Sequence, residues 1–249
     1  MPMKRIVALL FLAFAFSANA WSQTQIVAHR GYWEGNAQNS IASLKKAQEF
    51  GCWGSEFDMH ITADDVVVIN HDRHIGGFNV QNSQSDDLRA FIPTLDEYLE
   101  QGAQDPGCVL VLELKPHSTP EREDRLIEAV IASLEAAQLL DPSRAVFISF
   151  SYYICQELAR KCPGFTVQYL EGDKTPAEVY ADGINGIDYH YSCFQKHPEW
   201  VQEAHDLGMS VNAWTVDNAD DIRQMRDLGV DQITTNNPAL TREILQELP

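Results

Sequence analysis

A regular alternation between short apolar segments and longer amphipathic segments, beginning at Ile26, constrains the fold more than any other feature of the chain. In one amphipathic segment Leu126, Val130 and Leu134 recur at the spacing of a helix face. Strands that alternate with helices predict βα units and a parallel sheet. The predicted strands are residues 26–31, 54–60, 109–115, 145–151, 166–172, 186–192, 210–217 and 231–237, and the predicted helices include 40–50, 94–101, 122–140, 197–207 and 218–228.

Eight βα units predict one TIM (β/α)8 barrel domain, which we expect to span residues 21–249. An open doubly wound sheet is the alternative, but HRGYWEG after the first strand is no G-x-G-x-x-G phosphate loop. The polar segment 71–89 predicts a small insertion after the second strand, and the apolar run 66–69 that leads into it predicts a strand additional to the eight.

Nearly every predicted strand begins apolar and ends polar, as in EFDMH, ELK, DYHYS and WTVD. In a parallel barrel the carboxyl ends of the strands meet at one face, where the active sites of such barrels lie. A barrel without a site has no need of reactive side chains at so many of these positions. The pattern therefore indicates an enzyme.

Three carboxylates stand near the ends of two of these strands. Glu56 and Asp58 share one face of their strand because alternate residues of a strand point the same way. Glu113 lies on the next strand of the alternation, between apolar residues. Buried carboxylates need a partner, and a set of oxygen ligands suits Mg²⁺ or Ca²⁺ better than zinc. We therefore predict one divalent cation, either Mg²⁺ or Ca²⁺, on these three residues.

Two histidines and two cationic residues accompany the carboxylates. His29 ends the first strand and His71 follows the apolar run VVVIN, so together they offer an acid and a base for displacement at phosphorus. Arg30 and Lys115 supply positive charge for phosphate oxygens. His60 shares a face with Glu56 and Asp58 but lies further along the strand, and we interpret it as a supporting residue and not as a ligand.

The motifs AHRG, SEFDMHITADDVVVINHD and LELKP resemble the signature of glycerophosphodiester phosphodiesterases. The resemblance continues more loosely through NAWTVD and DQITTNNP to about Pro238. It implies a TIM barrel that hydrolyses glycerophosphodiesters to sn-glycerol 3-phosphate and an alcohol with the help of a divalent metal.

Carried over by position, the resemblance implies that Glu56, Asp58 and Glu113 are metal ligands and that His29 and His71 are the acid–base pair. It further implies that Arg30 and Lys115 contact the phosphate and that Trp214 lies near the glycerol. The nucleophile is either the substrate's glycerol hydroxyl, which gives a cyclic phosphate, or water. Glu171 ends the fifth strand, and we predict that it also lies near the substrate.

The chain departs from the family pattern in two places. Ala37-Gln38-Asn39-Ser40 replaces the common P-E-N-T segment, so Gln38 removes a charge near the site, while Asn39 and Ser40 remain able to cap the next helix. Asn236-Asn237 stands where an aspartate is often seen.

Several other side chains have two interpretations each. Asp188, His190 and Tyr191 either contact the alcohol part of the substrate or pack near the barrel mouth. Tyr32 and Trp33 either line the pocket or form its rim. We expect Tyr152 and Tyr153 to begin a helix.

Two other functional classes stay open at this stage. A lipid-directed relative acting on lysophospholipids or phosphoinositides would need an apolar entry route, whereas segment 71–89 is rich in Asn, Gln and Asp. A protein that binds glycerophosphodiesters without turning them over would have no need of both His29 and His71. Small water-soluble diesters are therefore the preferred substrates.

The first twenty residues have the pattern of a cleaved secretory signal: Lys4 and Arg5, an apolar run, and a final Ala-Asn-Ala. We expect an exported protein, periplasmic or secreted, without stable membrane insertion. The formal net charge of −18 becomes −20 without Lys4 and Arg5 and argues against nucleic acid as a partner. Five cysteines without metal-like spacing predict mostly buried thiols, although a bridge between Cys52 and Cys108 is conceivable in an exported protein.

Overall fold

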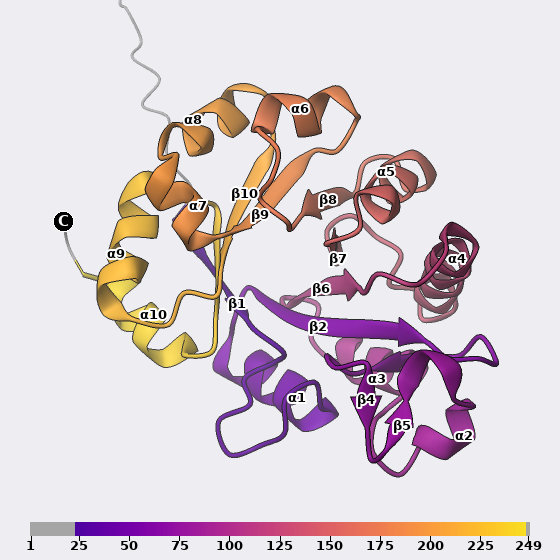
Figure 1. Cartoon of the computed structure of the whole chain (residues 1–249). Helices are drawn as coiled ribbons and strands as arrows, with labels where there is room; N and C mark the ends of the chain where they lie inside the picture. The colour runs from indigo at the N-terminus through magenta and orange to yellow at the C-terminus, as the bar shows by residue number, and fades with distance from the viewer. Residues whose placement is uncertain (1–22, 248–249) are drawn as a thin grey trace, which may run out of the picture.

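The computed structural model describes residues 23–247, and the predicted signal at residues 1–20 lies outside them. Eight parallel strands close into a barrel because β1 pairs with β11 on one side and with β2 on the other. The helices lie outside this ring (Figure 1). The predicted TIM barrel is confirmed. Its strands are β1 (Gln25–Ala28), β2 (Gly54–Ile61), β6 (Val109–Leu114), β7 (Ala145–Ser149), β8 (Thr166–Tyr169), β9 (Gly186–His190), β10 (Ser210–Trp214) and β11 (Gln232–Thr235).

The helices pack their apolar faces onto the outside of the barrel. Outward residues of β2 such as Phe57 and Met59 belong to one large buried cluster with Leu126 and Val130 of the longest helix. The longer helices are α1 (Ile41–Phe50), α3 (Leu95–Gly102), α4 (Pro120–Ala136), α5 (Tyr152–Lys161), α8 (Glu199–Asp206), α9 (Ala219–Leu228) and α10 (Pro238–Leu245). The shorter ones are α2 (Ser85–Leu88), α6 (Pro176–Ala181), α7 (Tyr191–Lys196) and the 3-10 turn η1 (Val80–Asn82).

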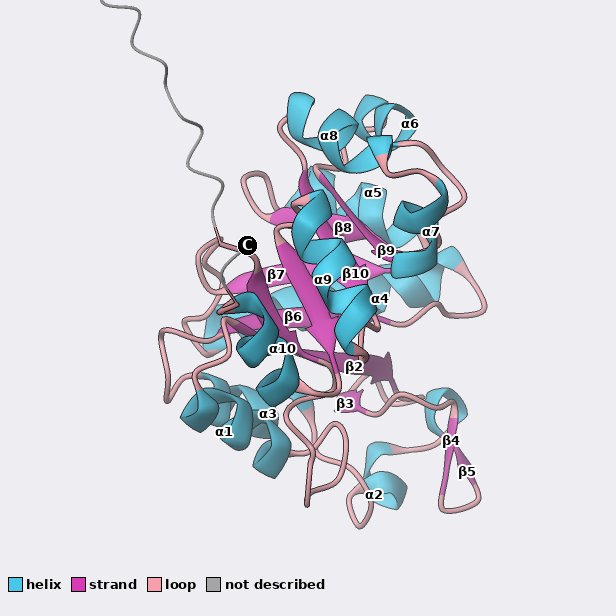
Figure 2. Cartoon of the chain, turned by 90° about the vertical axis from the view of Figure 1, so that its left-hand side faces the viewer, coloured by secondary structure: helices cyan, strands magenta, loops and turns pink. Residues whose placement is uncertain are grey.

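The insertion after β2 is present as predicted. The additional strand β3 (Val67–Ile69) pairs antiparallel with the end of β2. The segment that follows forms a small hairpin, β4 (His74–Ile75) and β5 (Phe78–Asn79), which projects away from the barrel with α2 beside it (Figure 2).

Most barrel strands end earlier than the sequence predicted. Residues 170–172 and 215–217 already belong to loops, and Tyr191 begins α7 instead of extending β9. The polar residues after each strand therefore sit on loops at the barrel mouth. Apolar alternation continues into these loops because Leu170 and Val216 are buried there, which is why the pattern overestimated strand length.

The interior of the barrel is apolar over much of its length and acidic at the mouth. Val27, Val111, Val146 and Ile148 form an apolar inner cluster. At the mouth the inward positions of β2 and β6 carry carboxylates, since Asp58 and Glu113 are register partners on neighbouring strands.

Two features bear on the predicted environment. All five cysteines are free, and four of them, including Cys52 and Cys108, are buried. None of the helices between residues 23 and 247 has the length and apolar character needed to cross a membrane.

Candidate active site

Glu56, Asp58 and Glu113 form a compact acidic cluster inside the barrel mouth. One carboxylate oxygen from each lies within 4.8 Å of the others. The cluster follows from strand geometry, because Glu56 and Asp58 are two residues apart on β2 and Glu113 stands opposite Asp58 on β6. All three side chains are buried.

Two neighbours hold the cluster in place. The Lys115 ammonium lies 2.6 Å from Asp58 Oδ1 and 2.6 Å from Glu113 Oε1. The Asn39 side chain forms two hydrogen bonds with Asp58: Nδ2 donates to Asp58 Oδ2 at 2.7 Å, and Oδ1 accepts from the Asp58 backbone N–H at 3.1 Å. Asn39 is therefore not the helix cap that its position suggested. Ser40 caps α1 alone, and Asn39 positions a predicted ligand.

The HRG loop after β1 is shaped to meet the same cluster. The Arg30 backbone N–H donates to Glu56 Oε2 at 2.7 Å, and Arg30 Nε lies 3.5 Å from Asp58 Oδ2. Arg30 and Gly31 both have positive φ, 56° and 79°. A Cβ on Gly31 would lie 2.3 Å from Ser43 Oγ, so only glycine fits where the loop touches α1. Gln38 accepts from Arg30 Nη1 at 2.9 Å and does not reach the acidic cluster.

The pKa values of the three carboxyl groups are shifted in opposite directions: burial and repulsion raise those of Glu56 and Glu113, and Lys115 and Asn39 lower that of Asp58. Burial, followed by the nearby Asp58, raises the pKa of Glu113 to about 8. Burial and the neighbouring carboxylates also hold the pKa of Glu56 well above its usual range. Burial alone would raise the pKa of Asp58, but Lys115 and the Asn39 hydrogen bond outweigh it and leave that pKa below its ordinary value.

The cluster fits a hard divalent cation. Glu56 Oε1 is buried without a hydrogen-bond partner, and a buried polar atom without a partner is costly unless a ligand supplies one. The donors are all carboxylate oxygens, the type that Mg²⁺ and Ca²⁺ prefer. Residue geometry and chemistry are thus compatible with such an ion.

His29 is held in a defined orientation by Asn236. Asn236 Oδ1 lies 2.8 Å from His29 Nδ1 and also accepts from Trp33 Nε1 at 3.2 Å, while Asn236 Nδ2 donates to Asp217 Oδ2 at 2.7 Å. Because an indole N–H can only donate and a carboxylate can only accept, the amide orientation is fixed. His29 Nδ1 must then carry its proton, which leaves the Nε2 lone pair free. Burial and the adjacent Arg30 lower the pKa of His29 to about 4, so the ring is neutral at neutral pH.

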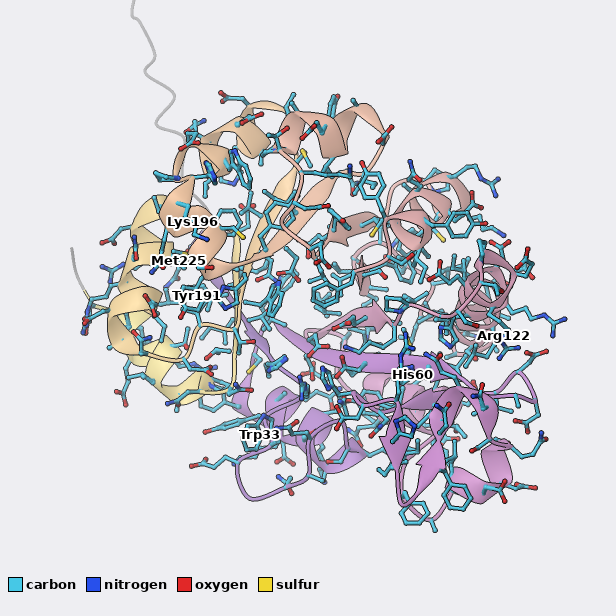
Figure 3. The ribbon with its side chains drawn as sticks, viewed as in Figure 1. Trp33, His60, Arg122, Tyr191, Lys196 and Met225 are labelled. Atoms are coloured by element: carbon cyan, nitrogen blue, oxygen red, sulfur yellow. The ribbon has the colours of Figure 1, made fainter. Side chains whose placement is uncertain are left out.

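His71 stands on the insertion side of the pocket. Its Nδ1 donates to Asp72 Oδ1 at 2.7 Å. His60 supports it from below: His60 Nε2 donates to the His71 carbonyl at 3.2 Å, and His60 Nδ1 accepts from Gln81 Nε2 at 3.0 Å. Figure 3 places His60 where β2 meets the insertion. This agrees with the supporting role expected for it.

Most of the predicted site residues line one pocket of about 170 Å³. Asp58 does not line this pocket but is paired with Lys115, which does. Trp214 lies at the mouth, where its Nε1 donates to the Asp188 carbonyl at 2.8 Å. The pocket is lined by His29, Arg30, Glu56, His71, Glu113, Lys115, Ile148, Phe150, Leu170, Asp188, Trp214 and Thr234.

Glu171 is not brought into the pocket. The chain leaves β8 at Tyr169, Leu170 takes the inward position, and Glu171 is exposed. Of the residues with two interpretations, Asp188 lines the pocket, while His190 and Tyr191 do not. Tyr32 and Trp33 line a separate shallow cavity together with Asp217.

The opposite end of the barrel contains a larger cavity of about 300 Å³. Its lining is neutral and includes Gln168, Ser210 and Gln232. Without a charged or titratable side chain, this cavity is no candidate for phosphodiester chemistry.

Sequence reasoning missed Asn39 and Asn236 as residues that position the site. Asn39 has a φ of 54°, a conformation that asparagine tolerates better than most residues. A left-handed asparagine directly before a capping serine is the available signal, and it is easily mistaken for a second capping residue. Asn236 offered no local signal, since its partner His29 is 207 positions away.

Known proteins resemble this chain over nearly its whole length. The model of the glycerophosphoryl diester phosphodiesterase family matches residues 29–88 and 75–240. A glycerophosphodiester phosphodiesterase from Caldanaerobacter subterraneus is 27% identical over 240 residues, covering 87% of this chain and 95% of the relative. A crystal structure of a glycerophosphodiester phosphodiesterase from Parabacteroides distasonis is 42% identical, with a TM-score of 0.87 over 90% of this chain and 97% of that one.

A third likeness is more distant and concerns the fold alone. The Oleispira antarctica phosphodiesterase, solved in complex with the product sn-glycerol-3-phosphate, superposes with a TM-score of 0.78 at 24% identity over 90% of this chain and 98% of that one. With the family model matched over most of the sequence, the resemblance seen in the motifs is confirmed. The chain belongs to the glycerophosphoryl diester phosphodiesterase family.

Proposed function

We propose that the protein hydrolyses small glycerophosphodiesters to sn-glycerol 3-phosphate and an alcohol, in a reaction that needs a divalent cation. The predicted enzyme class, a phosphoric diester hydrolase, is that of the family. One observation supports the specific reaction most strongly: a single pocket is lined by Glu56 and Glu113 of the acidic cluster, by two histidines, and by Arg30 and Lys115. The product held by the Oleispira antarctica relative agrees with this substrate class.

Glu56, Asp58 and Glu113 would hold the cation, which is either Mg²⁺ or Ca²⁺. A bound cation supplies a Lewis acid that draws charge from a phosphoryl oxygen. Arg30 and Lys115 would bind the remaining phosphate oxygens, and Arg30 is well placed for this because its backbone N–H is already fixed to Glu56.

His29 would act as the base. The Asn236 bond leaves its Nε2 lone pair free, and burial together with Arg30 keeps the ring neutral. That lone pair would take the proton of the attacking hydroxyl. That hydroxyl belongs either to water or to the substrate's own glycerol.

His71 would act as the acid. The Asp72 carboxylate accepts from its Nδ1 and orients the ring, and Nε2 would deliver the proton that the leaving oxygen needs. The two rings thus differ in their partners, one bonded to a neutral amide and the other to a carboxylate.

The test is release of sn-glycerol 3-phosphate from glycerophosphocholine, glycerophosphoethanolamine and glycerophosphoinositol. Each diester is incubated in chelator and again with Mg²⁺ or Ca²⁺ restored. We expect hydrolysis only with a cation, and a loss of roughly 100-fold or more in kcat for His29→Ala and His71→Ala. His74→Ala, which removes an exposed histidine of the same insertion, is the matched control and should retain activity.

Two outcomes would contradict the proposal. Full turnover in chelator would show that the reaction needs no cation. Near-wild-type rates for both histidine variants would show that His29 and His71 are not the acid–base pair. Diester binding without any turnover would favour the binding-protein alternative. Faster turnover of lysophospholipids than of the water-soluble diesters would favour the lipid-directed alternative.

We also propose that the protein is exported. The support is the sequence pattern of residues 1–20 alone. Fractionation of the native host, with cleavage after Ala20 read by mass spectrometry, tests this.

A further inference from the structure

Asp188 is a buried carboxyl group in the pocket that the proposed chemistry does not use. It lies on β9, its side chain is 1% exposed, and it lines the same pocket as Glu56 and Glu113. Its Oδ1 has no hydrogen-bond partner. It stands outside the group of carboxylates close enough to share an ion. A buried polar atom of this kind points to a ligand that completes its hydrogen bonds.

The surroundings of Asp188 differ from the rest of the pocket. The charged lining comes from β1, β2, β6 and their loops, whereas Ile148, Phe150, Leu170 and Trp214 form an apolar wall on the other side. Phe150 and Trp214 meet edge to face with ring centres 5.5 Å apart. Asp188 lies on β9, between the strands whose ends carry Leu170 and Trp214, and its register partner on β10 is Asn212. A carboxyl group beside an apolar wall suits a small polyol, whose carbons would contact the rings while a hydroxyl forms a hydrogen bond with the carboxyl group.

The size of the pocket indicates which end of the diester lies there. Glycerophosphodiesters share the glycerol phosphate and differ in the alcohol. A pocket of about 170 Å³ is below the usual range of roughly 300–1,000 Å³ for larger ligands, so it suits the small invariant group. The variable alcohol then extends toward the open mouth.

Resting on the proposed function, we propose that Asp188 binds the terminal hydroxyl of the substrate's glycerol, at carbon 1, and so selects diesters whose glycerol is unacylated. A fatty acyl group on that oxygen would remove the hydroxyl and would need space that the pocket lacks. Asp188 is in this sense a specificity residue of the active site.

The charge state of Asp188 is compatible with a nearby anionic substrate. Burial, and next the proximity of Glu113, hold the pKa of Asp188 well above its usual range. A neutral carboxyl group does not repel a phosphodiester, and it can donate a hydrogen bond as well as accept one.

The experiment pairs a substrate change with a residue change. Glycerophosphoethanolamine is compared with its analogue in which hydrogen replaces the carbon-1 hydroxyl, using wild type, Asp188→Leu and Asp188→Asn. For wild type we expect kcat/KM to be roughly 10- to 100-fold higher for the full substrate, the effect of one buried hydrogen bond. Asp188→Leu should lower that preference to within about threefold of unity, and Asp188→Asn, which still offers hydrogen bonds, should keep most of it.

Two controls separate binding from folding. Asp188→Leu has a similar shape and removes a buried carboxyl group whose Oδ1 is unpaired, but it also removes the interaction with Asn212. Its melting temperature should therefore stay within a few degrees of that of wild type. Glu123→Gln alters a buried carboxylate outside the pocket and should leave the substrate preference unchanged.

The inference is overturned if Asp188→Leu keeps the wild-type preference, or if it lowers kcat/KM equally for both substrates. Failure of the proposed function looks different, because wild type would then hydrolyse neither diester with any cation. In that case the affinities of the same three proteins for glycerol 3-phosphate and its 1-deoxy analogue decide the matter. Equal affinities of wild type for the two ligands would overturn the role of Asp188.

Discussion

Titration of the acidic cluster should work against the stability of the metal-free protein as the pH rises from 5 to 7. His29 and His60, whose pKa values burial lowers to about 4, work in the opposite direction over the same range. Burial and Asp58 raise the pKa of Glu113 from its ordinary 4.5 to about 8. Between these two values the folded protein holds a proton that the unfolded chain has released. Stability falls with pH wherever the folded state binds more protons, so Glu113 opposes folding increasingly over this window.

The magnitude follows from the size of the shift. Each pH unit costs about 1.4 kcal/mol once the unfolded carboxyl group is fully ionised. At pH 5 the unfolded carboxyl group is only partly ionised, so the contribution of Glu113 between pH 5 and pH 7 is about 2 to 3 kcal/mol. Glu56, whose pKa burial also raises, adds in the same direction.

The assay is urea unfolding of wild type and Glu113→Gln at both pH values, in chelator and reductant, followed by circular dichroism. The amide does not titrate, and the histidines are common to both proteins. The unfolding free energy of wild type should therefore fall relative to that of the variant by about 2 to 3 kcal/mol from pH 5 to pH 7. Saturating Mg²⁺ or Ca²⁺ should shift the pH dependence of wild type toward that of the variant, because a bound cation favours ionised carboxylates. The same pH dependence in metal-free wild type and variant would refute the reasoning.

Four further changes have definite expected results. Asn236→Ala should lower kcat roughly 10- to 100-fold with little change in KM, because His29 loses the bond that fixes its proton; an unchanged kcat in steady-state kinetics would contradict this. Asn39→Ala removes two hydrogen bonds from Asp58 and should cost about 3 kcal/mol in urea unfolding. Gly31→Ala should cost about 2 kcal/mol or more, since a Cβ at this positive φ meets Ser43. Gln38→Glu should change cation affinity by less than about fivefold in a calorimetric titration, because its contact with Arg30 is exposed.

The sequence predicted the barrel because each βα unit carries its own local signal. Strand length was the weak point, since Leu170 and Val216 remain buried beyond the ends of β8 and β10. The acidic cluster was predictable for a simple reason: Glu56 and Asp58 alternate on one strand, and Glu113 occupies the matching register on its neighbour.

The positioning residues were beyond local reasoning. Asn236 reaches His29 only because β11 closes the barrel against β1, and Asn39 reaches Asp58 only through a left-handed turn. Glu171 was predicted near the substrate on the assumption that its strand continued to residue 172. In the structure β8 ends at Tyr169, and Glu171 is exposed. Contacts of these two kinds depend on barrel closure or on one unusual φ angle. They leave no periodic pattern in the sequence, so the sequence does not predict them.

Local charge explains how so acidic a protein can bind an anion. The formal net charge is −18, whereas the phosphodiester substrate of the family is an anion. Its three clustered carboxylates exceed the positive charges of Arg30 and Lys115 by one when all are ionised, and the raised pKa values of Glu56 and Glu113 show that the metal-free cluster resists that state. A divalent cation would turn this deficit of one charge into an excess of one. Phosphodiester binding should therefore require the cation even in the His29→Ala variant, whose turnover we expect to fall about 100-fold or more. Equal affinity of that variant for glycerophosphoethanolamine in chelator and in saturating cation would show that Arg30 and Lys115 suffice alone.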